Sequence, residues 1–150
     1  MTLDNNLMSA IKEAMLAKDE ARLRTLRSVK TAFTVAKTEK GASGTLTDDQ
    51  EVKIIQKLYN QRKEALVLYE KEGREELARK EREEMDILES FLPKQLSDED
   101  LEAALREIIQ KTGASGPADM GKVMGAATKA LAGKAEGARI SAKVRAILAG

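Results

Sequence analysis

Ten residues in the last third of the chain, GPADMGKVMG at 116–125, have the spacing of a phosphate-binding loop. The pattern G-x-x-x-x-G-K is matched by Gly116, Gly121 and Lys122. In such a loop, backbone N–H groups and the lysine hold nucleotide phosphates, and a Ser or Thr after the lysine binds magnesium. Here Val123 replaces the hydroxyl, and the carboxylate of Asp119 would repel a bound phosphate. The spacing is present, but the residues that the chemistry needs are not.

The elements around this stretch argue against a nucleotide site as well. Ser97 is a predicted N-cap, so a helix begins at Asp98 and ends near Gly113. A phosphate-binding loop follows a strand, whereas a helix leads into 116–125. Pro117 suits the first turn of a second helix, whose apolar positions are Met120, Val123, Met124, Ala127 and Leu131. A third short helix has Ile140, Val144, Ile147 and Leu148 on one face.

The first two thirds of the chain also have helical periodicity. Residues 5–40 predict two helices, or one helix kinked at 18–20, and Thr47 with Gln50 forms a capping box. The helix that starts there runs to about Lys71. Its buried face is predicted to contain Val52, Ile55, Tyr59, Leu66 and Tyr69, widened by Leu58, Ala65 and Leu68. Residues 74–90 are mostly charged and predict a solvated helix face with a narrow apolar seam.

Pro93 marks a boundary, because the residue before a proline is disfavoured in a helix. The predicted fold class is therefore all-α. A long-helix N-terminal domain occupies residues 1–93, and a small three-helix C-terminal bundle occupies residues 94–150.

The composition limits the chemistry that this chain can perform. It has no Cys and no His, so it lacks a thiolate nucleophile and a side chain that titrates near neutrality. No serine lies in a nucleophile motif, and neighbouring acids such as Glu83 and Glu84 are expected to point to different sides of a helix. We predict no catalytic residue, metal site or cofactor. No segment has the ~20 apolar residues of a membrane span, so a cytoplasmic location is expected.

Basic residues are concentrated near the end of the chain. From residue 111 onward there are seven Lys and Arg against two Asp and Glu, although the whole chain has a net charge of only +1. Such a patch suits a nucleic-acid backbone, while the scarcity of aromatic residues leaves little for base stacking. An ordinary solvated face is the alternative. The candidate RNA-binding residues are Lys122, Lys129, Lys134, Arg139, Lys143 and Arg145.

Gly121 and Gly125 lie four residues apart and face the same way on the predicted middle helix. Each costs about 1 kcal/mol relative to alanine in a helix interior, so their presence needs a reason. Close packing against a neighbouring helix of the bundle is the favoured interpretation. Contact with an RNA backbone or a partner protein is the alternative.

Three separated stretches resemble the GatB/YqeY family over essentially the whole chain. They are IKEAMLAKDEARLRTLRSVKTA at 11–32, ILESFLPKQLSDEDLEAAL at 87–105, and DMGKVMG at 119–125 with the turn at 133–137 after it. The chain is most similar to the free-standing, YqeY-like members. These resemble the tail domain of the GatB subunit of the tRNA-dependent amidotransferase, the enzyme that makes Gln-tRNA or Asn-tRNA from the mischarged forms.

The resemblance implies an all-helical module that binds tRNA and leaves the amidotransferase chemistry to other domains. It also raises two alternatives: an adaptor that docks a partner protein, and a component of a carbon-nitrogen ligase that uses glutamine as nitrogen donor. The residues themselves give the ligase no support. The RNA, the partner and the oligomeric state are not predicted.

Overall fold

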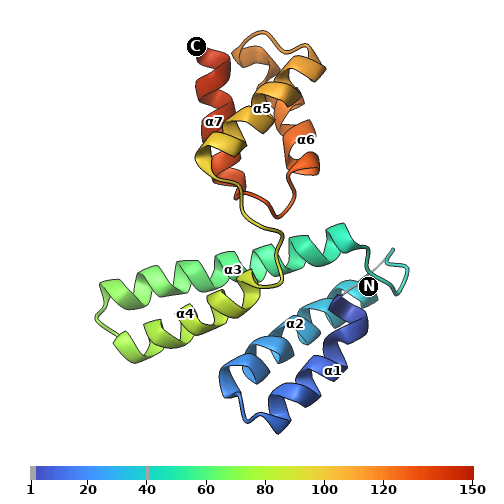
Figure 1. The fold of residues 1–150 in the computed structure, drawn as a ribbon, viewed down its shortest axis with the longest axis vertical. Coiled ribbons are helices and arrows are strands. Elements are labelled where there is room, and N and C mark those ends of the chain that lie inside the picture. The colour runs from blue at the N-terminus through green and yellow to red at the C-terminus, as the bar shows by residue number, and fades with distance from the viewer. Residues whose placement is uncertain (1–2, 40) are drawn as a thin grey trace. The chain divides into compact units, whose positions relative to one another are not determined.

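The computed structural model describes residues 3–39 and 41–150, and every regular element within them is a helix (Figure 1). The elements are α1 (Leu3–Leu16), α2 (Glu20–Thr38), α3 (Asp48–Lys71), α4 (Glu75–Glu89), α5 (Asp98–Thr112), the 3-10 turn η1 (Pro117–Asp119), α6 (Met120–Ala130) and α7 (Gly137–Ala149). The predicted all-α class is confirmed. The chain divides into two compact units, Met1–Leu92 and Pro93–Gly150.

Local capping interactions set several of the helix boundaries. The Asp19 side chain accepts a hydrogen bond from the Arg22 backbone N–H at 3.0 Å, so residues 3–38 form two helices rather than one kinked helix. The predicted capping box at α3 is present. The Gln50 N–H donates to Thr47 Oγ1 at 3.2 Å, and the Thr47 N–H donates to Gln50 Oε1 at 2.8 Å. Such reciprocal caps satisfy amide groups that the helix itself leaves unpaired.

The core of the N-terminal unit lies among α1, α2, α3 and the end of α4. Its buried members are Leu7, Ile11, Ala14, Leu26, Val29, Phe33, Ile55 and Leu88. The predicted buried face of α3 is only partly correct, because Ile55 is buried whereas Leu68 is 58% exposed. In Figure 1 the α3–α4 hairpin extends past α1 and α2, so no third helix of this unit covers the end of α3 where Leu68 lies.

Charged groups inside the N-terminal unit correct two sequence-based predictions. Glu84 is 7% exposed, so the charged segment 74–90 is not simply a solvated face. Its carboxylate lies 3.3 Å from Arg24 Nε and 3.1 Å from Arg62 Nε. Arg24 also donates to Glu83 at 3.4 Å, so Glu83 and Glu84 converge on one guanidinium instead of pointing apart. A guanidinium has several N–H donors and can span both carboxylates.

A second buried carboxylate connects the first and third helices. Glu51, in the first turn of α3, accepts hydrogen bonds from the backbone N–H groups of Leu3 and Asp4, each at 3.0 Å. These amides belong to the first turn of α1, where they have no partner within the helix and a negative charge is favourable. Lys37 Nζ donates to both carboxylate oxygens of Asp4, at 2.9 and 2.8 Å. This ion pair connects the end of α2 to the first turn of α1.

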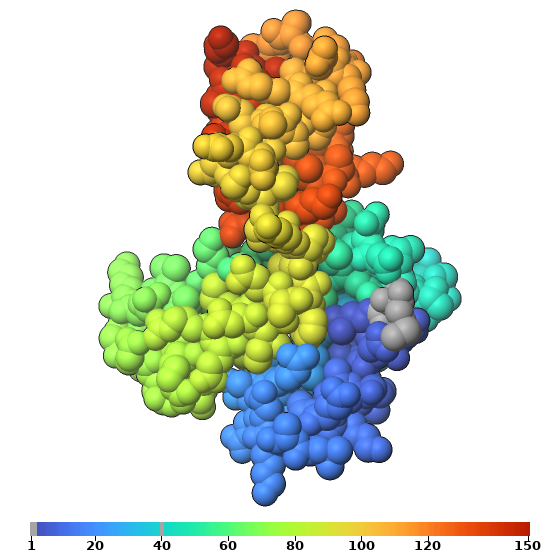
Figure 2. All heavy atoms as spheres, in the orientation of Figure 1, coloured from blue at the N-terminus to red at the C-terminus, as the bar shows by residue number. Residues whose placement is uncertain are grey.

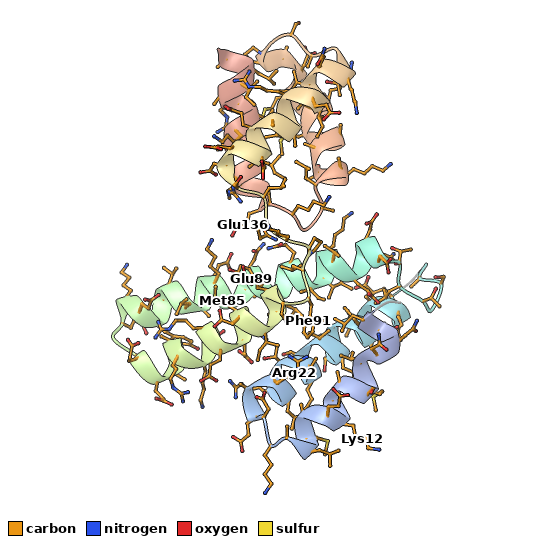
Figure 3. The ribbon with its side chains drawn as sticks, viewed as in Figure 1. Lys12, Arg22, Met85, Glu89, Phe91 and Glu136 are labelled. Atoms are coloured by element: carbon orange, nitrogen blue, oxygen red, sulfur yellow. The ribbon has the colours of Figure 1, made fainter. Side chains whose placement is uncertain are left out.

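The segment after α4 is attached to α2 by an aromatic contact. The Arg22 guanidinium lies over the Phe91 ring, 5.5 Å from its centroid. Figure 3 labels both side chains. A cation over an aromatic face is stabilising even when both groups are partly exposed.

Replacing Glu81 with glutamine tests whether its negative charge, partly buried beside Glu84, lowers the stability of the N-terminal unit. Burial, and then the charge of Glu84, raise the pKa of Glu81 above its ordinary value of 4.5. Its Oε2 accepts no hydrogen bond among the described residues, although Arg62 Nε lies 3.7 Å away and partly offsets the rise. The group therefore favours folding below pH 4.5, and this contribution is lost as the pH rises through the raised value. Thermal melts should show Glu81→Gln about 0.5 kcal/mol more stable than wild type at neutral pH, a difference limited by solvent screening.

The pH dependence and a matched acid on the same helix provide the controls. The stabilisation by Glu81→Gln should disappear as the pH falls below 4.5. Glu76, exposed on α4, has its pKa lowered by hydrogen bonding to Arg79. Glu76→Gln should therefore change neutral stability slightly in the opposite direction. A destabilised Glu81→Gln at pH 7 would contradict the argument.

The C-terminal unit has an aliphatic core, because all four aromatic residues of the chain lie before residue 93. Its buried members are Leu101, Leu105, Val123, Ala127, Leu131, Ala135, Ile140 and Val144. The segment that leads into α5 is held by the α6–α7 connection. The Leu96 N–H donates to the Lys134 carbonyl at 2.9 Å, and Gln95 Nε2 donates to the Gly133 carbonyl at 2.6 Å.

Candidate nucleic-acid interface

In the loop with phosphate-binding spacing, the carboxylate of Asp119 binds a backbone amide of the loop itself. Asp119 Oδ2 accepts a hydrogen bond from the Ser115 N–H at 2.9 Å. This bond is the main cause of a lowered pKa for Asp119, supported by the Gly116 N–H and by the charge of Lys122. The amides that a bound phosphate would need are thus engaged by Asp119, and helix α5 precedes the loop. Both findings agree with the rejection of a nucleotide site.

The glycine face of α6 is open rather than packed. A Cβ built on Gly121 or Gly125 would meet no heavy atom within 4 Å apart from its immediate surroundings in the helix. The interpretation that a neighbouring helix packs closely on these glycines is therefore wrong. α6 buries the opposite side, with Val123 and Ala127 fully covered, and this leaves Gly121 and Gly125 on the solvent side.

Two of the predicted basic residues flank this open face. Lys122 and Lys129 are exposed on α6, and neither forms an ion pair within residues 3–39 and 41–150. Gly125 is three residues from Lys122 and four from Lys129, so all three lie on one side of the helix. In Figure 2 a long side chain from the orange segment of α6 projects clear of the unit's surface. We call the strip made by Gly121, Lys122, Gly125 and Lys129 the α6 face.

The other four basic residues differ in how they are used. Lys134 and Arg145 are exposed, and the described part of the chain gives neither an ion pair. Arg139 is engaged: its Nη2 donates to the Leu96 carbonyl at 3.1 Å and to Asp98 Oδ1 at 2.8 Å. Arg139 lowers the pKa of Asp98 by hydrogen bonding and charge, and Lys143 adds to this through its charge.

The pairing of Arg139 with Asp98 could not be predicted from the sequence. The two residues are 41 positions apart, and no local pattern connects them. The structure brings Asp98, Arg139, Ala142 and Lys143 together around one shallow depression. The six predicted residues are therefore not one uniform set of free cations. Lys122, Lys129, Lys134 and Arg145 are available to a ligand, whereas Arg139 already stabilises the start of α5.

The structure is that of an all-helical protein, and its C-terminal unit has exposed cations beside an open helix face. Among the described residues, no helix is long and apolar enough to cross a membrane. The family model for Yqey-like proteins matches residues 4–148. The chain therefore belongs to the YqeY-like family, as its sequence motifs predicted.

A curated relative has a name that refers to mitochondria. The chain is 33% identical over 115 residues to Altered inheritance of mitochondria protein 41, mitochondrial, from Vanderwaltozyma polyspora. The match covers 71% of this chain and 60% of the relative, so the chain spans well under the full length of that protein.

Proposed function

We propose that this protein is a tRNA-binding accessory module without a catalytic centre of its own, related to the tail of the glutamine-dependent amidotransferase. The tRNA contacts are made by the C-terminal unit, a three-helix bundle, through its exposed cations. The long-helix N-terminal domain forms the rest of the module. The proposed location is the cytoplasm. The mitochondrial location in the relative's name is a statement about that protein.

The observation that carries this proposal is the open α6 face. Without side chains at Gly121 and Gly125, a phosphodiester strand can approach the helix backbone closely. Lys122 and Lys129 lie on the same side and can reach phosphates on the approaching strand. The unit contains no aromatic residue, so contacts to the backbone are favoured over base stacking.

A salt titration tests the proposal directly. Binding of labelled tRNA to the full chain is measured by fluorescence anisotropy between about 50 and 200 mM salt. Four phosphate contacts, from Lys122, Lys129, Lys134 and Arg145, predict a slope of about −3 in log K against log [salt]. The affinity should therefore fall roughly sixtyfold across that range. Affinity that does not respond to salt, or no binding at low salt, would rule the proposal out.

The adaptor alternative rests on the same open face. Because Gly121 and Gly125 have no side chains, a helix of a partner protein could also approach α6 closely there. The two proposals differ in salt response. An apolar helix contact is largely independent of salt, whereas phosphate binding is not.

A further inference from the structure

An open groove of about 820 Å³ lies in the N-terminal unit, which the proposed tRNA site does not use. Seven of its lining residues come from α2, between Glu20 and Ala32, and Leu58 of α3 contributes the eighth. Between Glu20 and Ala32 the helix rises about 18 Å, a little over three turns. The groove thus has the length of a docked helix of about twelve residues.

The apolar part of the groove comes from aliphatic side chains on two helices. Leu23 and Ala32 on α2 and Leu58 on α3 line it. Leu23 and Leu58 are only partly buried, although they also contact the core of the unit. Partly exposed aliphatic groups spaced along a groove are the usual receptor for the apolar face of an amphipathic helix.

Polar contacts hold two of the lining side chains in place. Arg24 Nε is 3.3 Å from Glu84 on α4, and Arg62 Nη2 on α3 donates to Ser28 Oγ at 3.0 Å. These bonds connect α2 to α3 and α4 beside the groove. A groove whose side chains are already ordered loses less entropy when a ligand binds.

Two charged residues of the groove have no ion-pair partner in the part of the chain that the structure describes. Arg27 is exposed, and Glu20 lies seven residues before it on α2. Two helical turns separate them, about 10 Å along the axis. An occupant that complements these charges has a carboxylate opposite Arg27 and a basic residue about two turns away, opposite Glu20.

We propose that this groove docks an amphipathic helix of a partner protein, with its aliphatic face on Leu23, Ala32 and Leu58 and a carboxylate paired with Arg27. The chemistry favours a helix over RNA. Of the two arginines in the lining, Arg24 is already paired with Glu84, which leaves Arg27 to attract a phosphate. Glu20 repels a phosphate, and the aliphatic side chains offer it no hydrogen bond. The α6 face, by contrast, combines free lysines with exposed backbone.

The test starts with selection of helical peptides from a random display library on the immobilised full chain. Binding of each enriched peptide is then measured by fluorescence anisotropy with wild type and three variants. Ala32→Arg fills the groove, and Arg27→Glu reverses its free charge. Lys30→Glu is the matched control, because Lys30 is also an exposed cation of α2 but does not line the groove.

We expect an enriched amphipathic peptide whose affinity falls about tenfold or more with Ala32→Arg and with Arg27→Glu, and stays unchanged with Lys30→Glu. Changing the peptide's carboxylate to lysine should restore binding to Arg27→Glu. Circular dichroism confirms that each variant is folded, and exposed Arg27 gives a variant that does not disturb the core. The proposal is overturned if no enriched peptide responds to Ala32→Arg, or if Arg27→Glu weakens tRNA binding instead.

Discussion

Reversing Lys122 and Lys129 together to glutamate is expected to weaken tRNA binding about a hundredfold in roughly 0.1 M salt. Each phosphate contact releases a condensed counterion, which at this salt concentration contributes about sixfold in affinity. Loss of two contacts accounts for about a fortyfold loss of affinity, and the two new carboxylates repel the phosphates of the tRNA. Both lysines are exposed and form no ion pair within the described residues, and Lys122 acts on Asp119 through its charge alone, so the fold should be largely unaffected.

A charge-matched control separates a local contact from a general loss of positive charge. Lys12 and Lys57 are exposed in the N-terminal unit and form no ion pair among the described residues, and Lys12→Glu with Lys57→Glu changes the net charge equally. This control should leave the affinity within about threefold of wild type, because neither lysine belongs to the proposed contact surface and charges outside a contact are screened by salt. Equal losses in both double variants would mean that the α6 face is not the contact surface.

Arg139 is expected to respond differently from the two lysines. Its guanidinium is bonded to the Leu96 carbonyl and to Asp98, so a phosphate would have to displace an existing partner. An ion pair already formed within the protein releases fewer counterions on binding than a free cation does. The proposed contact surface is therefore centred on α6 and extends to Lys134 and Arg145, rather than covering all six basic residues equally.

Local signals in the sequence predicted the helices and most of their ends. The capping box at Thr47, the N-cap at Ser97 and the left-handed Gly113 depend only on residues within one turn. Helical periodicity likewise identified Val123, Ala127 and Leu131 as core residues of the C-terminal unit. These features are predictable because a helix end and a helix face are defined within a few positions of the chain.

Burial of charge depends on partners that are distant in the sequence and was not predicted. Glu84 is covered because Arg24 and Arg62, on two other helices, approach it. Glu51 is covered because it accepts hydrogen bonds from the first amides of α1. A carboxylate is rarely buried without such partners, and periodicity carries no information about them.

The surroundings of Gly121 and Gly125 also could not be decided from the sequence. Two glycines four residues apart favoured a close helix neighbour in the sequence analysis, but they are also consistent with a surface left open for a ligand. Only the position of α6 in its unit decides between them. The structure shows that Gly121 and Gly125 face solvent. Glycine loses more conformational freedom on folding than alanine does, and no packing within this unit offsets that loss.

Replacing both glycines with alanine is therefore expected to stabilise the C-terminal unit by about 1.5 kcal/mol. Neither residue has a positive φ, and an added methyl group would meet no atom within 4 Å. The gain arises because alanine has less backbone freedom to lose on folding. Hydrogen exchange of the α6 amides, followed by mass spectrometry, measures this locally. The unit has no Tyr or Trp for a fluorescence melt.

The same double variant should bind tRNA more weakly, because two methyl groups hold the phosphate backbone away from the helix. A larger side chain, as in Gly125→Leu, should weaken binding further while α6 remains folded. Slower exchange together with lower affinity would show that the glycines sacrifice stability for close approach of a ligand. Slower exchange with unchanged tRNA affinity would remove Gly121 and Gly125 from the contact surface and leave the lysines alone to explain binding. Faster exchange would contradict the open face itself, since only an unseen neighbour could make the methyl groups unfavourable.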